Sequence, residues 1–170
     1  MTYSIKEIYY TIQGEGYHTG RPAVFCRFSG CNLWSGREID RKLAKCNFCD
    51  TDFVGTNGQS GCKYKTASHL VKEIISYWPS NVKPFVVLTG GEPMLQVNDE
   101  LINELKINNF EIAIETNGTF IVPNTIDWIC VSPKVGSNLL QLKGDELKLV
   151  YPQEGINPED YEDLKFKYFS

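Results

Sequence analysis

No stretch of the 170-residue sequence is apolar and long enough to cross a bilayer, and its first residues lack the apolar core of a signal peptide. Positive charge is also sparse, since Lys and Arg number 17 against 21 Asp and Glu, and the net charge is −4. Such scattered charge lacks the basic face of a nucleic-acid-binding protein. Low-complexity tracts and internal repeats are missing as well. We therefore expect a cytoplasmic protein that binds neither membranes nor nucleic acids, with a single domain over residues 1–170.

Short strand-like stretches alternate with two amphipathic helical patterns. Thr66 can cap a helix that Pro79 stops, and Asn98 or Asp99 opens a second helix that ends at Asn108. Strands that alternate with helices in this way form a mostly parallel sheet covered by helices. We therefore predict an α/β fold, a partial (β/α) barrel of mostly parallel strands. The expected strands are residues 3–11, 23–29, 84–88, 110–115, 127–132 and 146–151.

Glycine-rich or polar segments directly follow several of these strands, at GCN, TGGEP, ETNGT and SPK. Ligands of parallel α/β sheets bind at the carboxyl ends of the strands. In TGGEP, Gly90 and Gly91 allow the backbone to approach a ligand closely, and Glu92 can accept hydrogen bonds from a cationic amine. The alternative for this segment is a simple turn in which Pro93 starts a helix. Three such segments at one edge predict a site rather than three turns.

Six cysteines in a chain without secretory features favour metal binding or catalysis over disulfides. Cys31, Cys46 and Cys49 have the spacing C-x14-C-x2-C. Three ligands leave one iron of a [4Fe–4S] cluster open, as a catalytic cluster requires. The alternative is a structural zinc site, which needs a fourth ligand such as Cys62 or His69.

The other cysteines have simpler interpretations. Cys26 and Cys130 lie in expected strands, where a free cysteine packs as a small apolar residue. Cys62 is expected to be a loop thiol in an irregular insertion at about residues 30–65. An irregular segment of that length inside a compact domain is usually functional.

Six segments together carry a resemblance to a known family: TIQGEG, AVFCRFSGCNLW, CDTDF, TGGEP, ETNGT and VSPK. They span nearly the whole chain and resemble the 7-carboxy-7-deazaguanine synthase family of the radical S-adenosylmethionine superfamily. The long first cysteine loop resembles this family rather than the superfamily's usual C-x3-C-x2-C. The resemblance implies that 6-carboxy-5,6,7,8-tetrahydropterin is contracted to 7-carboxy-7-deazaguanine with loss of ammonia, in 7-deazapurine and queuosine biosynthesis.

The resemblance also implies the cofactors and their ligands. Cys31, Cys46 and Cys49 would hold the [4Fe–4S] cluster, at which S-adenosylmethionine is cleaved to start radical chemistry. The hydroxyl of Thr51 would bind Mg²⁺, a hard cation that prefers oxygen ligands. The contacts to S-adenosylmethionine would come from Phe48, Asp50, Gly91, Glu92, Ser132, Pro133 and Lys134.

By the same resemblance, the pterin would be bound from the first two strands and from TGGEP. Arg27 has the bidentate geometry that suits a carboxylate, although a surface ion pair is its alternative role. Gln13 and Glu15 are alternatively ordinary turn residues. The full predicted set for the substrate is Ile12, Gln13, Gly14, Glu15, Arg27 and Thr89.

Two other functions fit part of the sequence. A radical S-adenosylmethionine activase of a glycyl-radical enzyme has the cluster and TGGEP but needs neither TIQGEG nor Thr51 as a metal ligand. A zinc-stabilised binding module needs only the cysteines. The resemblance further implies a homodimer and a low-potential electron donor such as a flavodoxin. The family continues beyond a final strand, whereas this sequence stops at KFKYFS, so we expect a truncated core without the C-terminal tail.

Overall fold

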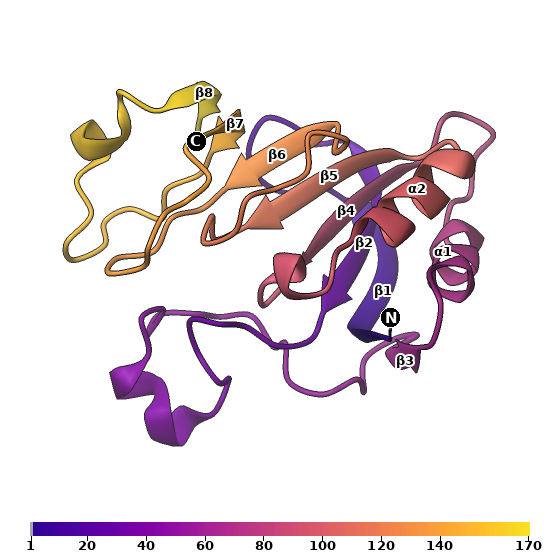
Figure 1. Cartoon of the computed structure of the whole chain (residues 1–170), viewed down its shortest axis with the longest axis horizontal. Helices are drawn as coiled ribbons and strands as arrows, with labels where there is room; N and C mark the ends of the chain where they lie inside the picture. The colour runs from indigo at the N-terminus through magenta and orange to yellow at the C-terminus, as the bar shows by residue number, and fades with distance from the viewer. Residues whose placement is uncertain (1) are drawn as a thin grey trace.

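A computed structural model of the chain describes residues 2–170 and contains one sheet of eight strands (Figure 1). The strands are β1 Tyr3–Ile12, β2 Pro22–Phe28, β3 Cys62–Tyr64, β4 Phe85–Gly90, β5 Glu111–Thr116, β6 Trp128–Val131, β7 Lys143–Leu147 and β8 Lys165–Phe169. They lie in the order β3-β1-β2-β4-β5-β6-β7-β8. The six strands from β2 to β8 in this order are parallel, whereas β1 runs antiparallel to both β2 and β3. The predicted open, mostly parallel α/β sheet is confirmed.

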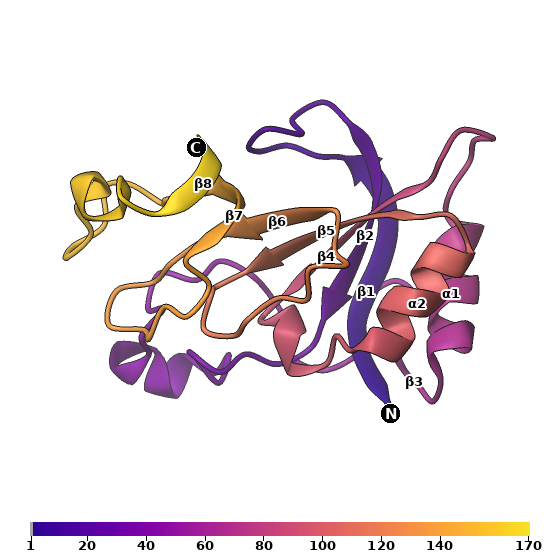
Figure 2. The same cartoon turned by 45° about the horizontal axis from the view of Figure 1, so that its top comes forward.

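Both α-helices form where capping residues precede an apolar periodicity. In α1 (Ala67–Ser76) the side chain of Thr66 accepts a hydrogen bond from the backbone of His69, and in α2 (Asp99–Ile107) Asn98 caps in the same way. Figures 1 and 2 show the two helices together on one side of the sheet. Their buried residues pack against alternate residues of the strands and form the main core.

The face of the sheet away from the helices carries a smaller apolar cluster and, nearer the carboxyl ends of the parallel strands, a group of polar residues. Because side chains alternate along a strand, residues that neighbour the core residues point to this second face. Strand pairing aligns Arg27 with Thr89, and Glu115 with Cys130 and then Glu146. Thr89 and Glu115 are joined by a hydrogen bond of 3.3 Å between the Thr89 hydroxyl and a carboxylate oxygen. We call these five residues, one from each of β2, β4, β5, β6 and β7, the polar row.

Two expectations about the fold were wrong in detail. The last strand was expected at 146–151, but β7 spans Lys143–Leu147, because its parallel pairing with β6 aligns Glu146 with Cys130. Cys62 is not a loop thiol, since it begins β3 and pairs with Ile5 of β1. Between β2 and β3 the chain otherwise contains one short regular element, the 3-10 helix η1 (Glu38–Leu43). Among residues 2–170, every helix is too short or too polar to cross a membrane.

Candidate active site

The three predicted cluster ligands lie together on segments that leave the sheet. Cys31 follows β2, whereas Cys46 and Cys49 lie on a turn after η1. The Cys46 thiol donates a hydrogen bond to Cys49 and lowers the pKa of Cys49 to about 6, helped by the backbone of Thr51. Burial raises the pKa of Cys31, whose charge interacts with that of Cys49. One thiol of the group is therefore held ready to ionise, as a metal ligand must be.

The cluster and the structural zinc site considered for these cysteines differ in the ligands that they need. Among residues 2–170, no three His, Cys, Asp or Glu side chains converge on one metal-ion position. Structural zinc needs four converging ligands, and its suggested fourth ligands lie elsewhere, Cys62 in β3 and His69 in α1. The thiols of a [4Fe–4S] cluster bind different irons and need not converge on one point. Both suggested fourth zinc ligands thus lie on other elements, and the assignment of Cys31, Cys46 and Cys49 to a [4Fe–4S] cluster stays a prediction.

An arginine holds the turn that carries two of these thiols. Arg41 in η1 donates from one nitrogen to the carbonyl oxygens of Asn47 and Cys49, each at 2.9 Å. Its guanidinium also stacks on Trp34, 4.1 Å from the ring centre, and pairs with Glu38 at 2.6 Å. Trp34, Glu38 and Arg41, which lie between Cys31 and Cys46, thus hold the turn in place, and we call these three residues the clamp. We call residues 31–53 the cluster loop. Sequence patterns gave no indication of this role for Arg41.

The glycines of TGGEP bring the end of β4 against the end of β2. A Cβ on Gly91 would lie 2.1 Å from the carbonyl oxygen of Gly30 and 2.9 Å from the Cβ of Cys31. The backbone of Glu92 donates to the same Gly30 oxygen at 2.9 Å. Gly90 has φ of 135°, a conformation that favours glycine. These glycines therefore allow β4 to lie close to the backbone before Cys31, whereas the predicted close approach to a ligand stays a prediction.

Glu92 is fully buried and bonded within the fold. One oxygen accepts from the backbone of Met94 and from the hydroxyl of Thr116, and the other accepts from the backbone of Asn117, at 2.8–2.9 Å. Pro93 begins the 3-10 helix η2 (Pro93–Leu95). The alternative interpretation of TGGEP, a turn in which Pro93 starts a helix, therefore also describes this segment. Burial raises the pKa of Glu92. A carboxylate has about four acceptor positions, so a contact with S-adenosylmethionine remains compatible with these bonds and stays a prediction.

The VSPK segment lies beside the thiols. Lys134 donates to the carbonyl and hydroxyl oxygens of Ser132 at 2.8 and 2.6 Å. Burial lowers the pKa of Lys134, while the neighbouring Cys46 and Cys49 favour its charged form. Among the other predicted cofactor contacts, Phe48 and Asp50 are exposed on the cluster loop, whereas Pro133 is buried.

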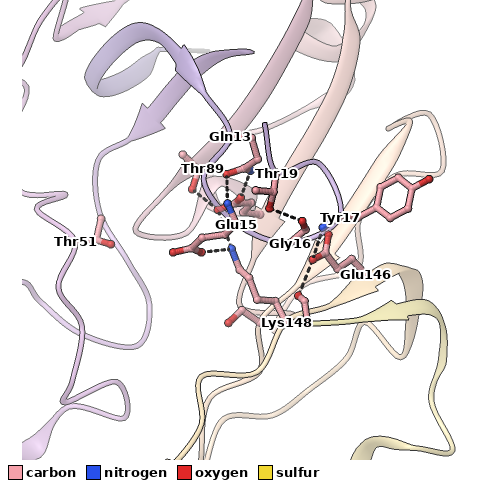
Figure 3. A network of polar contacts seen from close by, with 12 residues as sticks. Gln13, Glu15, Gly16, Tyr17, Thr19, Thr51, Thr89, Glu146 and Lys148 are labelled. Carbon is pink, nitrogen blue, oxygen red and sulfur yellow. Dashed lines mark hydrogen bonds and ion pairs between the residues drawn. The ribbon is translucent and has the colours of Figure 1, made fainter. Parts of the chain in front are cut away.

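The predicted substrate residues Gln13, Glu15 and Thr89 lie close together (Figure 3), and two of them bond to Glu115. Gln13 donates to one Glu115 oxygen at 2.9 Å, and Thr89 donates to the other at 3.3 Å. Lys148 lies 3.0 Å from Glu15 and 3.5 Å from Glu115. A cavity of about 10 Å³ between them has room for about one water, so a pterin ring does not fit inside the network as it stands.

Glu115 and Lys148 were missed as members of this network. ETNGT was recognised as a segment after a strand, but none of its residues was given a role. The available signal was position, since Glu115 is the penultimate residue of β5 and Lys148 directly follows β7, both at carboxyl ends.

The remaining predicted contacts lie outside this group. Arg27 donates to Glu7 at 2.9 Å and to the hydroxyl of Tyr9 at 3.1 Å, so its alternative role, an ion pair, is the one present. Ile12 is exposed, and nothing lies within 4 Å of a Cβ placed on Gly14. Figure 3 shows Thr51 apart from the network, and its hydroxyl lies 3.4 Å from Asp50.

Cys26 and Cys130, which lie outside the trio, are both buried but on different faces. Cys26 is fully buried in the core beneath the helices, as predicted. Cys130 is buried too, yet it belongs to the polar row and lines the small cavity. Burial raises the pKa of each, so both stay thiols.

The chain is similar to known proteins over nearly its whole length. The family model described as the Radical SAM superfamily matches residues 43–139. A 7-carboxy-7-deazaguanine synthase from Bradyrhizobium diazoefficiens is 58% identical over 100% of this chain and 81% of the relative. One from Burkholderia multivorans is 58% identical over 99% of this chain and 81% of its own length. A crystal structure of QueE from Escherichia coli has a TM-score of 0.64 and 29% identity, covering 88% of this chain and 71% of that one.

Proposed function

The chain belongs to the 7-carboxy-7-deazaguanine synthase family within the radical S-adenosylmethionine superfamily, and from this premise we propose its substrate and the residues that bind it. It is a radical S-adenosylmethionine lyase that forms 7-carboxy-7-deazaguanine, and its superfamily implies a [4Fe–4S] cluster and S-adenosylmethionine. The proposed substrate is 6-carboxy-5,6,7,8-tetrahydropterin, whose ring is contracted with loss of ammonia. This reaction belongs to 7-deazapurine biosynthesis, including the route to queuosine.

Cys31, Cys46 and Cys49 would hold the cluster. When bound, the cluster and S-adenosylmethionine together supply the one-electron chemistry that starts the radical reaction. Three protein ligands leave one iron for the amino acid part of S-adenosylmethionine. The chain's own task is to hold this cofactor and exclude water. The residues proposed to contact it are Phe48, Asp50, Gly91, Glu92, Ser132, Pro133 and Lys134.

The substrate would be bound from the polar row and the adjoining turn. A pterin edge offers amide and amino N–H donors, which match the carboxylates of Glu15 and Glu115. Thr89 and Gln13 already bond to Glu115 and so would fix its orientation. Arg27 would turn from Glu7 toward the carboxylate of the substrate. Ile12 and Gly14 would line the entrance.

We further propose Mg²⁺ as a second cofactor, with the hydroxyl of Thr51 as one ligand. An oxygen donor suits this cation, and Thr51 follows the cluster turn directly. A homodimer, a low-potential donor such as a flavodoxin, and a cytoplasmic location complete the proposal. All six cysteines are free thiols, as a reducing compartment maintains them.

The observation that carries the proposal is the contact of Gly91 with Gly30 and Cys31. This contact lies at the carboxyl ends of β2 and β4, which carry Arg27 and Thr89 of the polar row, and so it supports a site shared by cofactor and substrate. The test is an anaerobic assay of the reconstituted protein with the pterin, S-adenosylmethionine, reductant and Mg²⁺. We expect 7-carboxy-7-deazaguanine and ammonia in equal amounts. Cleavage of S-adenosylmethionine without this product would reject the proposed substrate.

A further inference from the structure

Two charged residues at the end of β7 hold the TIQGEG turn (residues 11–16) over the sheet. Glu146 accepts a hydrogen bond from the backbone of Tyr17 at 3.2 Å, and Lys148 pairs with Glu15 at 3.0 Å. A Cβ on Gly16 would lie 2.0 Å from a Glu146 oxygen, so the turn touches this carboxylate directly. The turn between β1 and β2 is therefore fixed to the distant strand β7 through one anion and one cation.

Lys148 connects two carboxylates that would otherwise repel each other. Its side chain is 19% exposed, against 71% for Glu15 and 22% for Glu115. Among residues 2–170, the ion pairs of Glu15 and Glu115 are both with Lys148. Burial lowers the pKa of Lys148, but its interactions with Glu115, Cys130 and Glu15 raise the pKa by more than burial lowers it. The net pKa is therefore raised, and the side chain stays an ammonium. Lys134 is the other cation whose charge interacts with it.

We infer that Lys148 is a positioning residue for the substrate: it holds the carboxylates of Glu15 and Glu115 together, facing the pterin-binding side of the polar row. This inference rests on the proposed function, because it assumes that these carboxylates bind the pterin. Two neighbouring carboxylates repel each other and tend to move apart, and this separation would cost an acceptor for the substrate's N–H groups. Lys148 prevents the separation without contacting the reacting atoms.

The position of the ion pairs between Lys148 and the two carboxylates predicts whether KM or kcat should change. Lys148 organises groups that bind the substrate before any chemistry, so its loss should weaken substrate binding and leave the bound reaction largely intact. A hydrogen bond to a charged partner contributes enough for an increase in KM of about tenfold or more. S-adenosylmethionine binds through other segments in the proposal, so its KM should not change.

The experiment compares Lys148→Met with Lys143→Met in the reconstituted holoenzyme. Lys143 begins β7, the strand that Lys148 directly follows, but it is exposed and outside the network, so it controls for the loss of a lysine. We expect Lys148→Met to raise the KM for the pterin about tenfold with kcat changed less than about threefold. Lys148→Arg, which keeps a cation, should recover most of the affinity. Lys148→Gln is the substitute if the methionine variant is insoluble.

A double-mutant cycle separates positioning from direct contact. If Lys148 acts through Glu15, then Lys148→Met combined with Glu15→Gln should weaken binding little more than Glu15→Gln alone. Hydrogen exchange at the amides of Glu15, Gly16 and Tyr17 should be faster in Lys148→Met than in wild type. These amides exchange without turnover, so the readout is independent of cluster loading.

Three results would overturn the inference. They are an unchanged KM in Lys148→Met, a fully additive cycle, and a fall in KM, which would mean that the ion pairs close the pocket against the substrate. A failure of the proposed function itself is distinguishable, because wild type and Lys143→Met would then also form no product from the pterin.

Discussion

The cluster loop and the polar row solve the same problem, the placement of reactive groups, by different means. In the cluster loop, residues 31–53, two of the proposed ligands lie on a turn outside the sheet, and Arg41 holds that turn through backbone carbonyls. In the polar row each group projects from a separate strand of one sheet. The loop is a local unit beside the fold, whereas the row is part of the fold itself. Substitutions in the cluster loop should therefore change activity with little effect on the unfolding free energy, whereas substitutions in the polar row should change both.

The largest expected effect compares Cys31→Ala with Cys26→Ala. Cys31→Ala removes a cluster ligand, so we expect loss of the cluster and of turnover, with unfolding free energy changed by about 1 kcal/mol or less. Cys26→Ala empties part of the core and should cost roughly 1 kcal/mol while leaving iron content normal. Iron analysis, visible absorption and urea unfolding give the two readouts. A Cys31→Ala protein with full iron and activity would remove Cys31 from the site.

Gly91→Ala tests the contact between the two regions. The added methyl group would overlap the Gly30 carbonyl, so we expect a loss of about 3 kcal/mol in unfolding free energy together with reduced iron loading. Gly14→Ala is the matched control for stability, because nothing lies within 4 Å of its Cβ. Urea unfolding of both variants decides the question. Equal midpoints would mean that the ends of β2 and β4 can separate freely.

Arg41→Met examines the clamp in the loop alone. Removing the two hydrogen bonds to Asn47 and Cys49 should free the turn, so we expect roughly half the iron per chain after reconstitution and faster loss of the cluster. The unfolding midpoint should stay nearly unchanged, since the loop lies beside the core. Arg37→Met is the control, because Arg37 is exposed in the same segment. Normal iron content in Arg41→Met would show that the turn holds its shape unaided.

Thr51→Val has the smallest expected effect. It keeps the shape of the side chain but removes the hydroxyl, so we expect an intact cluster with weaker activation by Mg²⁺ and a severalfold slower turnover. Thr51→Ser keeps the hydroxyl and should behave as wild type. Parallel Mg²⁺ titrations under anaerobic conditions provide the measurement. Identical activation curves for all three proteins would exclude Thr51 as a ligand.

Local patterns in the sequence predicted the helices and most strands, because caps and apolar periodicity act over a few residues. Thr66 and Asn98 cap α1 and α2 as expected. The position of β7 was wrong because Gly144 and Asp145 favour a turn locally, whereas pairing with β6 outweighs that preference. The short strand β3 was missed for a similar reason, since it exists only through its pairing with β1.

The site was predicted in its segments but not in its contacts. Gln13, Glu15 and Thr89 were chosen by resemblance, and the structure brings them together around Glu115. The pair of Lys148 and Glu15 joins residues 133 positions apart, and no local pattern records such a contact. The clamp by Arg41 was equally invisible, because its acceptors are backbone carbonyls that any residue provides.

The alternation of the polar row with core residues also constrains how the chain folds. Glu115 follows the core residue Ile114, and Glu146 precedes the core residue Leu147. A slip of one position in β5 or β7 would turn a carboxylate into the apolar layer under the helices, at a cost of several kcal/mol. Mispaired sheets are thus penalised by charges of the polar row. Glu115 and Glu146 therefore act during folding as a check on strand register, before any ligand is present.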